Sequence, residues 1–373
     1  SKSCGGLEQT FDFYLRGQNG WRQTERDGTR RELAQFRSRE VESVPGLHAE
    51  LSIDAMVQHV IEKELELLMA EYKPASATII VSEPQTGYIL GMANVPTFDP
   101  NNYNRSKLDE HRNRAITDVF EPGSTFKIVP ISAALEQKII ELDAIIDCTR
   151  TQVEYRGRLV KLPKEDFGYG TLTDIALPGE VRGVVHPPER WDGLTISRMP
   201  MGHALSATPL QVHMGMSVLA NKGVLMQPQL VRRVFDDEGK TVVDFSPKAK
   251  RRVLSSDTAR TVSLVLVDTV SARGTSARAQ IPGFEVAGKS GTSQKIINGL
   301  YSSHDHVASF SGFFPASQPR LVVTVIVDDA QVPGVAWGSS VAAPSFKRVA
   351  EQLIQYFGLK PVENYNKMIA WKE

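Results

Sequence analysis

Hydrophobic positions recur at helical spacing in several segments of this chain. One segment follows the capping residue Asp54 and ends near Pro74, and its apolar face comprises Val57, Ile61, Leu65 and Leu68. Another begins at Thr208-Pro209-Leu210-Gln211, which places a cap, a proline and a glutamine at the positions typical of a helix start, and it closes at Gly223. Two more helices are predicted at about 257–271 and about 345–357.

Strand patterns lie on both sides of these helices. Residues 77–82 and 88–94 flank a turn-forming segment, 83–87, and together predict an antiparallel hairpin. Three further strands are expected at 285–287, 307–314 and 321–327, and the last is rich enough in Val and Ile to be central in a sheet. Sheet elements at both ends with helices between them predict a mixed α/β, or α+β, domain closed by its own termini.

Residues 1–46 differ from the rest because charged side chains dominate from Arg22 to Glu42, with few apolar anchors. This pattern predicts partly exposed strands of a small module, and we expect a further region upstream of it.

Composition excludes several functions. Lys plus Arg and Asp plus Glu both number 43, so no net charge favours nucleic acid as a partner. Two cysteines, Cys4 and Cys148, are too few for a disulfide framework and poorly spaced for a metal site. No apolar run approaches the ~20 residues that a membrane-spanning helix needs.

Candidate chemistry begins at Glu121-Pro122-Gly123-Ser124-Thr125-Phe126-Lys127. If a helix starts near Gly123, Ser124 and Lys127 share one face, where the lysine amine can accept the serine hydroxyl proton. The backbone N–H groups at a helix start also favour a developing anion. Alone, this spacing is weak evidence, since on the order of one Ser-x-x-Lys is expected by chance in a chain of this length.

A second motif, Lys289-Ser290-Gly291-Thr292, follows the strand expected at 285–287. Lysine and small hydroxyl residues on an edge strand suit a substrate carboxylate, and Gly291 permits close backbone approach. For the four residues by themselves, an ordinary strand-to-turn segment is the better explanation.

The two motifs in this order, with their flanking segments, resemble the penicillin-recognising serine acyltransferases. The segments that resemble class B penicillin-binding proteins are Asn113–Asp118, Leu177–Glu180, Thr208–Gln211, Ala287–Thr292 and Ala342–Pro344. The Glu121-Pro122-Gly123 preface and the Ala-Ala-Pro-x-Phe ending resemble the cell-division, FtsI-like branch. The resemblance implies a central antiparallel sheet flanked by helices over residues 47–358. Residues 1–46 would then be the remnant of a β-rich pedestal domain, and residues 359–373 a C-terminal tail.

The resemblance implies a peptidoglycan D,D-transpeptidase that β-lactams acylate. Ser124 would be the nucleophile and Lys127 the base, and the backbone N–H groups of Ser124 and Thr292 would form the oxyanion hole. Lys289, Ser290, Gly291 and Thr292 would bind the substrate. No cofactor and no metal is implied. The implied partners are stem peptides, a membrane glycan polymerase and division proteins, and the implied location is the outer side of the cytoplasmic membrane, with the anchor outside this chain.

One family motif, Ser-x-Asn, has no counterpart in the sequence. The sole asparagine between Lys127 and Lys289 is Asn221, near a helix end, and Ser255-Ser256-Asp257 is interpreted as a helix cap. We place the absent segment between Thr173 and Asp174, and of two alternatives, a natural deletion and a segment that the molecule contains, we favour the second. Two alternatives remain open: a β-lactam hydrolase or sensor of the same fold, and a non-catalytic division scaffold with a degenerate site.

Overall fold

The computed structural model describes residues 5–33, 39–142, 144 and 167–361, so Cys4, Cys148 and most of the expected tail lie outside the described residues. The backbone divides into two compact units. The first comprises Ser1–Ser52, Ala176–Pro178 and Gln229–Ser246, and the second comprises Ile53–Ile175, Gly179–Pro228 and Pro247–Glu373. Within the described part of the chain, no helix has the length and apolar character that a membrane span requires.

The first unit is built from short strands. Its antiparallel pairs are β1 (Trp21–Gln23) with β4 (Arg39–Val41) and β2 (Glu25–Arg26) with β3 (Glu32–Leu33), preceded by α1 (Gly6–Thr10) and α2 (Asp12–Leu15). A three-stranded sheet has the order β10 (Thr241–Asp244), β9 (Val231–Phe235), β5 (His48–Leu51). Its small core contains Phe11, Val231 and Val234. The sequence predicts a domain boundary after residue 46, which lies before β5. The first compact unit instead extends to Ser52 and includes β5, because β5 pairs with the distant β9.

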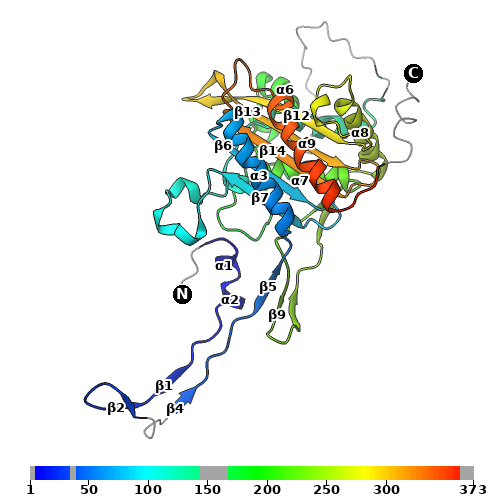
Figure 1. Ribbon diagram of the computed structural model, residues 1–373. Helices are drawn as coiled ribbons and strands as arrows, with labels where there is room; N and C mark the ends of the chain where they lie inside the picture. The colour runs from blue at the N-terminus through cyan, green and yellow to red at the C-terminus, as the bar shows by residue number, and fades with distance from the viewer. Residues whose placement is uncertain (1–4, 34–38, 143, 145–166, 362–373) are drawn as a thin grey trace. The chain divides into compact units, whose positions relative to one another are not determined.

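A five-stranded antiparallel sheet organises the second unit (Figure 1). Its order is β12 (Ala287–Ile297), β13 (Leu300–Phe314), β14 (Leu321–Asp328), β6 (Ser76–Ser82), β7 (Ile89–Val95). The central position of β14 and the β6–β7 hairpin confirm the sequence predictions. The strand expected at 285–287 is wrong in extent, because pairing with β13 carries β12 through Lys289–Thr292 to Ile297.

One face of the sheet packs against α3 (Ala55–Tyr72) and α9 (Gly338–Tyr356), drawn in blue and red in Figure 1. Asp54 caps α3 by accepting hydrogen bonds from the N–H groups of Met56 and Val57, as the sequence predicts. The start expected for α9 at residue 345 is wrong: the helix begins at Gly338 and contains Pro344.

The opposite face of the sheet packs against α7 (Pro209–Ala220), whose residues are all buried. Thr208 and Gln211 form the predicted reciprocal cap of this helix. The helix α8 (Ser256–Val270) contacts both α7 and α5 (Ile128–Glu136), and Ser255 caps α8 as expected. The remaining elements of this unit are α4 (Arg114–Thr117), α6 (Gly193–Arg198), β8 (Val224–Met226), β11 (Ala249–Arg252) and the 3₁₀ turns η2 (Pro100–Arg105), η3 (Leu108–His111), η4 (Gly123–Lys127), η5 (Pro188–Arg190), η6 (Met199–Met201) and η7 (Ala277–Ala279).

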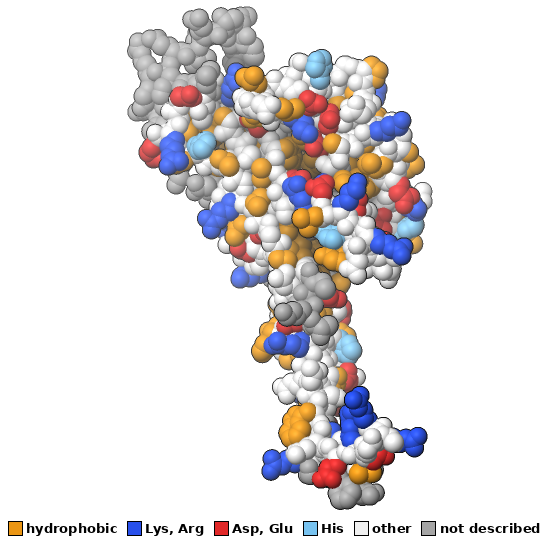
Figure 2. Space-filling model, turned by 90° about the vertical axis from the view of Figure 1, so that its left-hand side faces the viewer, with side chains coloured by type: hydrophobic (Ala, Val, Ile, Leu, Met, Phe, Trp, Pro, Cys, Tyr) orange, Lys and Arg blue, Asp and Glu red, His pale blue; other side chains and the backbone are white. Residues whose placement is uncertain are grey.

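Charged side chains of both signs are interspersed with apolar ones on the face drawn in Figure 2. This mixture accords with the equal numbers of basic and acidic residues in the chain.

Candidate active site

Ser124 and Lys127 lie on one turn of 3₁₀ helix, η4, which continues directly into α5. The sequence predicts a helix from Gly123, and the structure makes its first turn tighter than an α-helix. Because side chains three positions apart are aligned in a 3₁₀ helix, Ser124 and Lys127 share one face. Ser124 is partly buried and Lys127 is exposed.

The second motif lies within an edge strand. Among the described strands, β12 pairs with β13 alone, so its other edge is unpaired. Residues 289–292 are in the middle of this strand, which fixes their backbone in an extended conformation. Such an edge offers N–H and C=O groups to an added peptide strand.

Two glycines bring the motifs together. A Cβ atom on Gly291 would lie 2.7 Å from the Pro122 carbonyl oxygen and 3.1 Å from Cγ2 of Thr125. A Cβ atom on Gly123, where φ is +56°, would lie 3.0 Å from the Thr292 carbonyl oxygen. The residues on either side of Ser124 are therefore in van der Waals contact with the backbone of the Lys289–Thr292 motif.

The side chains of the second motif are partly buried and have defined partners. Nζ of Lys289 donates a hydrogen bond to the Ser290 carbonyl oxygen at 3.0 Å. Ser276 Oγ donates to Ser290 Oγ at 3.0 Å, and the Gly338 N–H at the start of α9 donates to Thr292 Oγ1 at 2.9 Å. The early start of α9 is therefore part of this site.

Burial, and after it the positive charge of Lys127, lower the pKa of Lys289 to about 8. This electrostatic effect links the two lysines, one from each motif. A lysine with a pKa near 8 stays largely protonated at neutral pH, which suits a carboxylate ligand.

Glu121 is a third feature of the site. Its carboxylate, 9% exposed, accepts hydrogen bonds from Nδ1 of His203 at 2.7 Å, the Ala204 N–H at 2.9 Å and the Tyr301 hydroxyl at 3.1 Å. Burial acts to raise the Glu121 pKa, but these hydrogen bonds outweigh burial and the net pKa is lowered. Glu121 is thus an ionised carboxylate beside the turn that carries Ser124 and Lys127.

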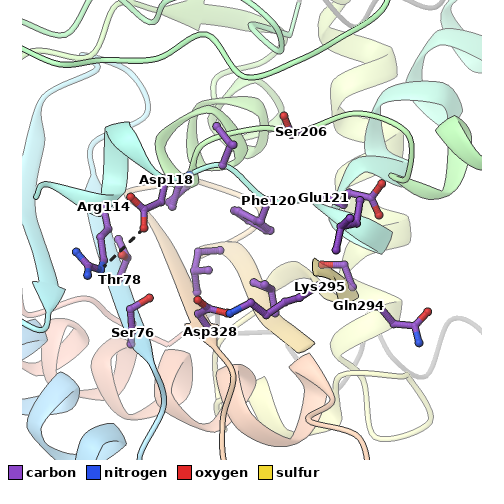
Figure 3. Close-up of a pocket in the computed structure, with 17 residues that line it drawn as sticks. Ser76, Thr78, Arg114, Asp118, Phe120, Glu121, Ser206, Gln294, Lys295 and Asp328 are labelled. Atoms are coloured by element: carbon purple, nitrogen blue, oxygen red, sulfur yellow. Dashed lines mark ion pairs between the residues drawn. The ribbon is translucent and has the colours of Figure 1, made fainter. Parts of the chain in front are cut away.

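Next to the motifs lies a pocket of about 260 Å³ (Figure 3). It lies over the ends of β6, β12 and β14 and beside Val307 of β13, and Glu121 forms part of its wall. Its charged side chains are paired: Lys295 with Asp328 at 2.8 Å, and Arg114 with Asp118 at 3.9 Å. Its lining residues include neither Ser124, Lys127 nor Lys289.

Sequence reasoning gave Glu121, His203 and Tyr301 no role. Their separations along the chain, 82 and 180 residues from Glu121, leave no local pattern to detect. An acidic residue immediately before Pro-Gly at a helix start was the sole signal.

Asn221, the sole asparagine between the two motifs, has a structural role. Asn221 is the residue that ends α7, and its Nδ2 donates to the Val224 carbonyl oxygen. Among the described residues, no group of three or more His, Cys, Asp or Glu side chains is placed to hold a metal ion.

Comparison with known proteins identifies the family. Residues 77–160 and 164–351 match the penicillin binding protein transpeptidase domain. Stage V sporulation protein D of Bacillus subtilis is 32% identical over 99% of this chain and 63% of its own length. The peptidoglycan D,D-transpeptidase FtsI of Escherichia coli K12 is 28% identical over 97% of this chain and 65% of its own length. The chain therefore spans less than two thirds of either relative.

The solved structures include penicillin binding protein 3 from Mycobacterium tuberculosis in complex with ampicillin. It superposes with a TM-score of 0.83 at 26% identity, covering 98% of this chain and 86% of that one. These similarities confirm both the resemblance and the fold that it implies.

Two features of the comparisons concern the absent motif. The family match is interrupted at 161–163 and runs without a break through Thr173 and Asp174. The alignment with the Bacillus protein has 409 positions, more than the 373 residues of this chain, so that relative has positions with no counterpart here.

With the matched segments, the two motifs and the fold in agreement, the chain belongs to the penicillin-binding protein transpeptidase family, and its relatives place it with the class B proteins of FtsI-like type.

Proposed function

We propose that this protein is a peptidoglycan D,D-transpeptidase that cross-links stem peptides through an acyl-enzyme on Ser124. The observation that carries the proposal is the close approach of Gly123 to Thr292 and of Gly291 to Pro122, which joins the turn that carries Ser124 to the edge strand that carries Lys289–Thr292. The names of the relatives supply the reaction class.

In the first step, Ser124 Oγ attacks the carbonyl of a terminal D-Ala-D-Ala while Lys127 accepts the hydroxyl proton. The carbonyl–nitrogen bond breaks, D-Ala leaves with that proton, and an ester to Ser124 remains. In the second step, an amine of a neighbouring stem peptide attacks the ester and restores the serine. A β-lactam acylates the same oxygen.

The second motif would bind the substrate. Lys289, Ser290 and Thr292 hold the terminal carboxylate, and Gly291 keeps the strand close to the nucleophile. The backbone N–H groups of Ser124 and Thr292 would form the oxyanion hole, in which one donor contributes about 3 kcal/mol to lowering the barrier.

The absent Ser-x-Asn segment belongs, in this proposal, at 161–163, where the family match is interrupted, and not between Thr173 and Asp174. The N–H of Thr173 bonds Glu180, and Asp174 pairs with Lys250, so this stretch is tied into the fold. Exposure of Lys127 and of the apolar Ile131 on the helix that follows it also supports a missing covering segment. Peptide mapping of the purified natural protein decides the matter, because an additional internal segment yields peptides between residues 128 and 180 that this sequence lacks.

The first unit would be the remnant of the pedestal domain, and the second unit the transpeptidase domain. By analogy with the relatives, the protein acts at the outer side of the cytoplasmic membrane, with a glycan polymerase and division proteins as partners. We expect a role in cell division. The sporulation protein among the relatives makes sporulation the second process in which the same reaction would serve.

Incubation with a labelled penicillin, followed by intact-mass and peptide analysis, tests the proposal. A long-lived adduct on Ser124 that is absent from Ser124→Ala supports the transpeptidase. Rapid turnover of the label indicates a hydrolase of the same fold, and no adduct indicates a non-catalytic scaffold.

A further inference from the structure

Glu121 is joined to two parts of the second unit that are distant in sequence. His203 and Ala204 follow η6, while Tyr301 lies near the start of β13. Tyr301 is also paired across the hairpin with Ile296 of β12, the strand that carries Lys289–Thr292. A carboxylate three residues before Ser124 is thus bonded to the hairpin of the second motif.

The backbone on either side of Glu121 is already fixed to the segment that follows η6. The Gly123 N–H donates to the Gly202 carbonyl oxygen at 3.0 Å. Phe120 and Ala207 exchange two N–H···O bonds, at 3.0 and 2.9 Å. These hydrogen bonds hold residues 120–123 against the segment that follows η6. The Glu121–Tyr301 hydrogen bond connects the same residues to β13.

The protonation states of Glu121 and Tyr301 favour the hydrogen bond between them. The Tyr301 pKa is raised, first by burial and then by the negative charge of Glu121, so the phenol stays neutral and donates. The Arg198 guanidinium lies 5.7 Å from the centre of the Tyr301 ring. The ionisable groups facing the Glu121 carboxylate are thus His203 and Tyr301, with Arg198 behind the ring.

We propose that Glu121 is a positioning residue that holds Ser124 in register with β12 through its bonds to His203, Ala204 and Tyr301. This inference rests on the proposed function. Because Glu121 also lines the pocket of Figure 3, the competing role is direct contact with the substrate. Loss of a positioning residue slows acylation at saturating ligand, whereas loss of a binding residue raises the concentration needed for saturation.

The test compares Glu121→Gln with the wild type in acylation by a fluorescent penicillin over a range of concentrations. The variant keeps the shape of the side chain but loses its charge, so we expect the maximal acylation rate to fall about 10- to 100-fold. The half-saturating concentration should stay unchanged. A raised half-saturating concentration with an unchanged rate, or no change in either, would overturn the proposal.

Glu136→Gln is the matched control. The Glu136 carboxylate accepts bonds from the Ser255 N–H and hydroxyl at the start of α8, and its pKa is also lowered overall, although burial opposes this. This change removes a similar bonded carboxylate away from the two motifs, and we expect it to leave the acylation rate unaltered.

Tyr301→Phe provides a second variant should Glu121→Gln fold poorly. It removes one donor to the Glu121 carboxylate, so the maximal acylation rate should fall while the half-saturating concentration stays unchanged. Tyr356→Phe, which removes a phenol bond to Asp54 instead, should leave the rate unaltered.

Hydrogen exchange separates this inference from the proposed function. A wild type that forms no adduct refutes the proposed function, yet exchange of residues 119–127 still reports on the turn. Faster exchange there in Glu121→Gln than in Glu136→Gln, with no faster exchange elsewhere except at the Ala204 N–H that Glu121 accepts, supports positioning. Unchanged exchange contradicts it.

Discussion

Gly291 lies so close to Pro122 that a methyl group on it would stand 2.7 Å from the Pro122 carbonyl oxygen. The same methyl group would lie 2.5 Å from Oγ of Ser309, on the neighbouring strand β13. The space beside Gly291 is therefore already filled, by the Pro122 backbone and by the side chains of Ser309 and Thr125. A side chain at position 291 requires either the strand or the turn to move.

Gly291→Ala is expected to reduce acylation by penicillin by about 100-fold, because displacement of a reacting group by about 1 Å has an effect of that size. Overpacking should also lower the free energy of unfolding by about 1–3 kcal/mol. Stopped-flow acylation and urea denaturation measure the two effects.

Gly28→Ala is the control for the Gly291 substitution, because no atom lies within 4 Å of the position of its added methyl group. It should change neither quantity. A fully active Gly291→Ala variant would show that the two motifs are farther apart in solution than in the structure.

The pKa of Lys289, about 8, predicts an alkaline limit to activity. If the ammonium binds the ligand carboxylate, acylation should fall roughly tenfold per pH unit above this value, as the protonated fraction falls. In Lys289→Arg the guanidinium stays charged, so whatever activity remains should lack this limb. The pH profile of the second-order rate constant measures both proteins, and an identical alkaline limb in the variant would assign it to another group.

Local signals predicted the elements whose ends are determined by neighbouring residues. The Asp54 cap of α3 and the Thr208–Gln211 cap of α7 are satisfied within one helical turn, and the sequence shows them directly. The Val- and Ile-rich β14 is recognised by composition because both of its faces are buried.

Elements determined by distant partners were predicted less well. Residues 289–294 contain Lys, Ser, Gly, Thr and Gln, a composition with little strand preference, and they extend β12 because β13 pairs with them. The early start of α9 depends on a bond from Gly338 to Thr292, and the partners of Glu121 lie far along the chain. The family resemblance supplied Ser124 as the proposed nucleophile, but no periodicity reveals the groups that hold it.

Arg348 of α9 is bonded to the fully buried carboxylate of Glu64 on α3. Its Nε lies 3.0 Å from both carboxylate oxygens, and its terminal nitrogen lies 2.6 Å from one of them. Arg348→Met would leave a buried charge without its partner, so we expect a loss of about 3–5 kcal/mol in the free energy of unfolding.

The comparison for Arg348 is Lys63→Met, which breaks an exposed pair with Glu66 and should cost at most about 0.5 kcal/mol. Urea denaturation of both variants provides the measurement. Equal losses would mean that burial of Glu64 is incomplete in solution.

His213 should make the protein less stable in acid. It is fully buried in α7 between Ser82 Oγ at 2.6 Å and Thr324 Oγ1 at 2.9 Å, and burial lowers its pKa to about 3. Below its ordinary pKa of about 6.5, the unfolded chain binds a proton that the folded chain does not. Stability from this residue is therefore complete above pH 6.5 and is lost as the pH falls, by about 1.4 kcal/mol per pH unit, until the folded pKa is reached. His213→Gln should be less stable at pH 7.5 but should lack this component of the slope. Urea denaturation between pH 7.5 and 5 compares the two slopes, and parallel curves would show that His213 takes up no proton on unfolding.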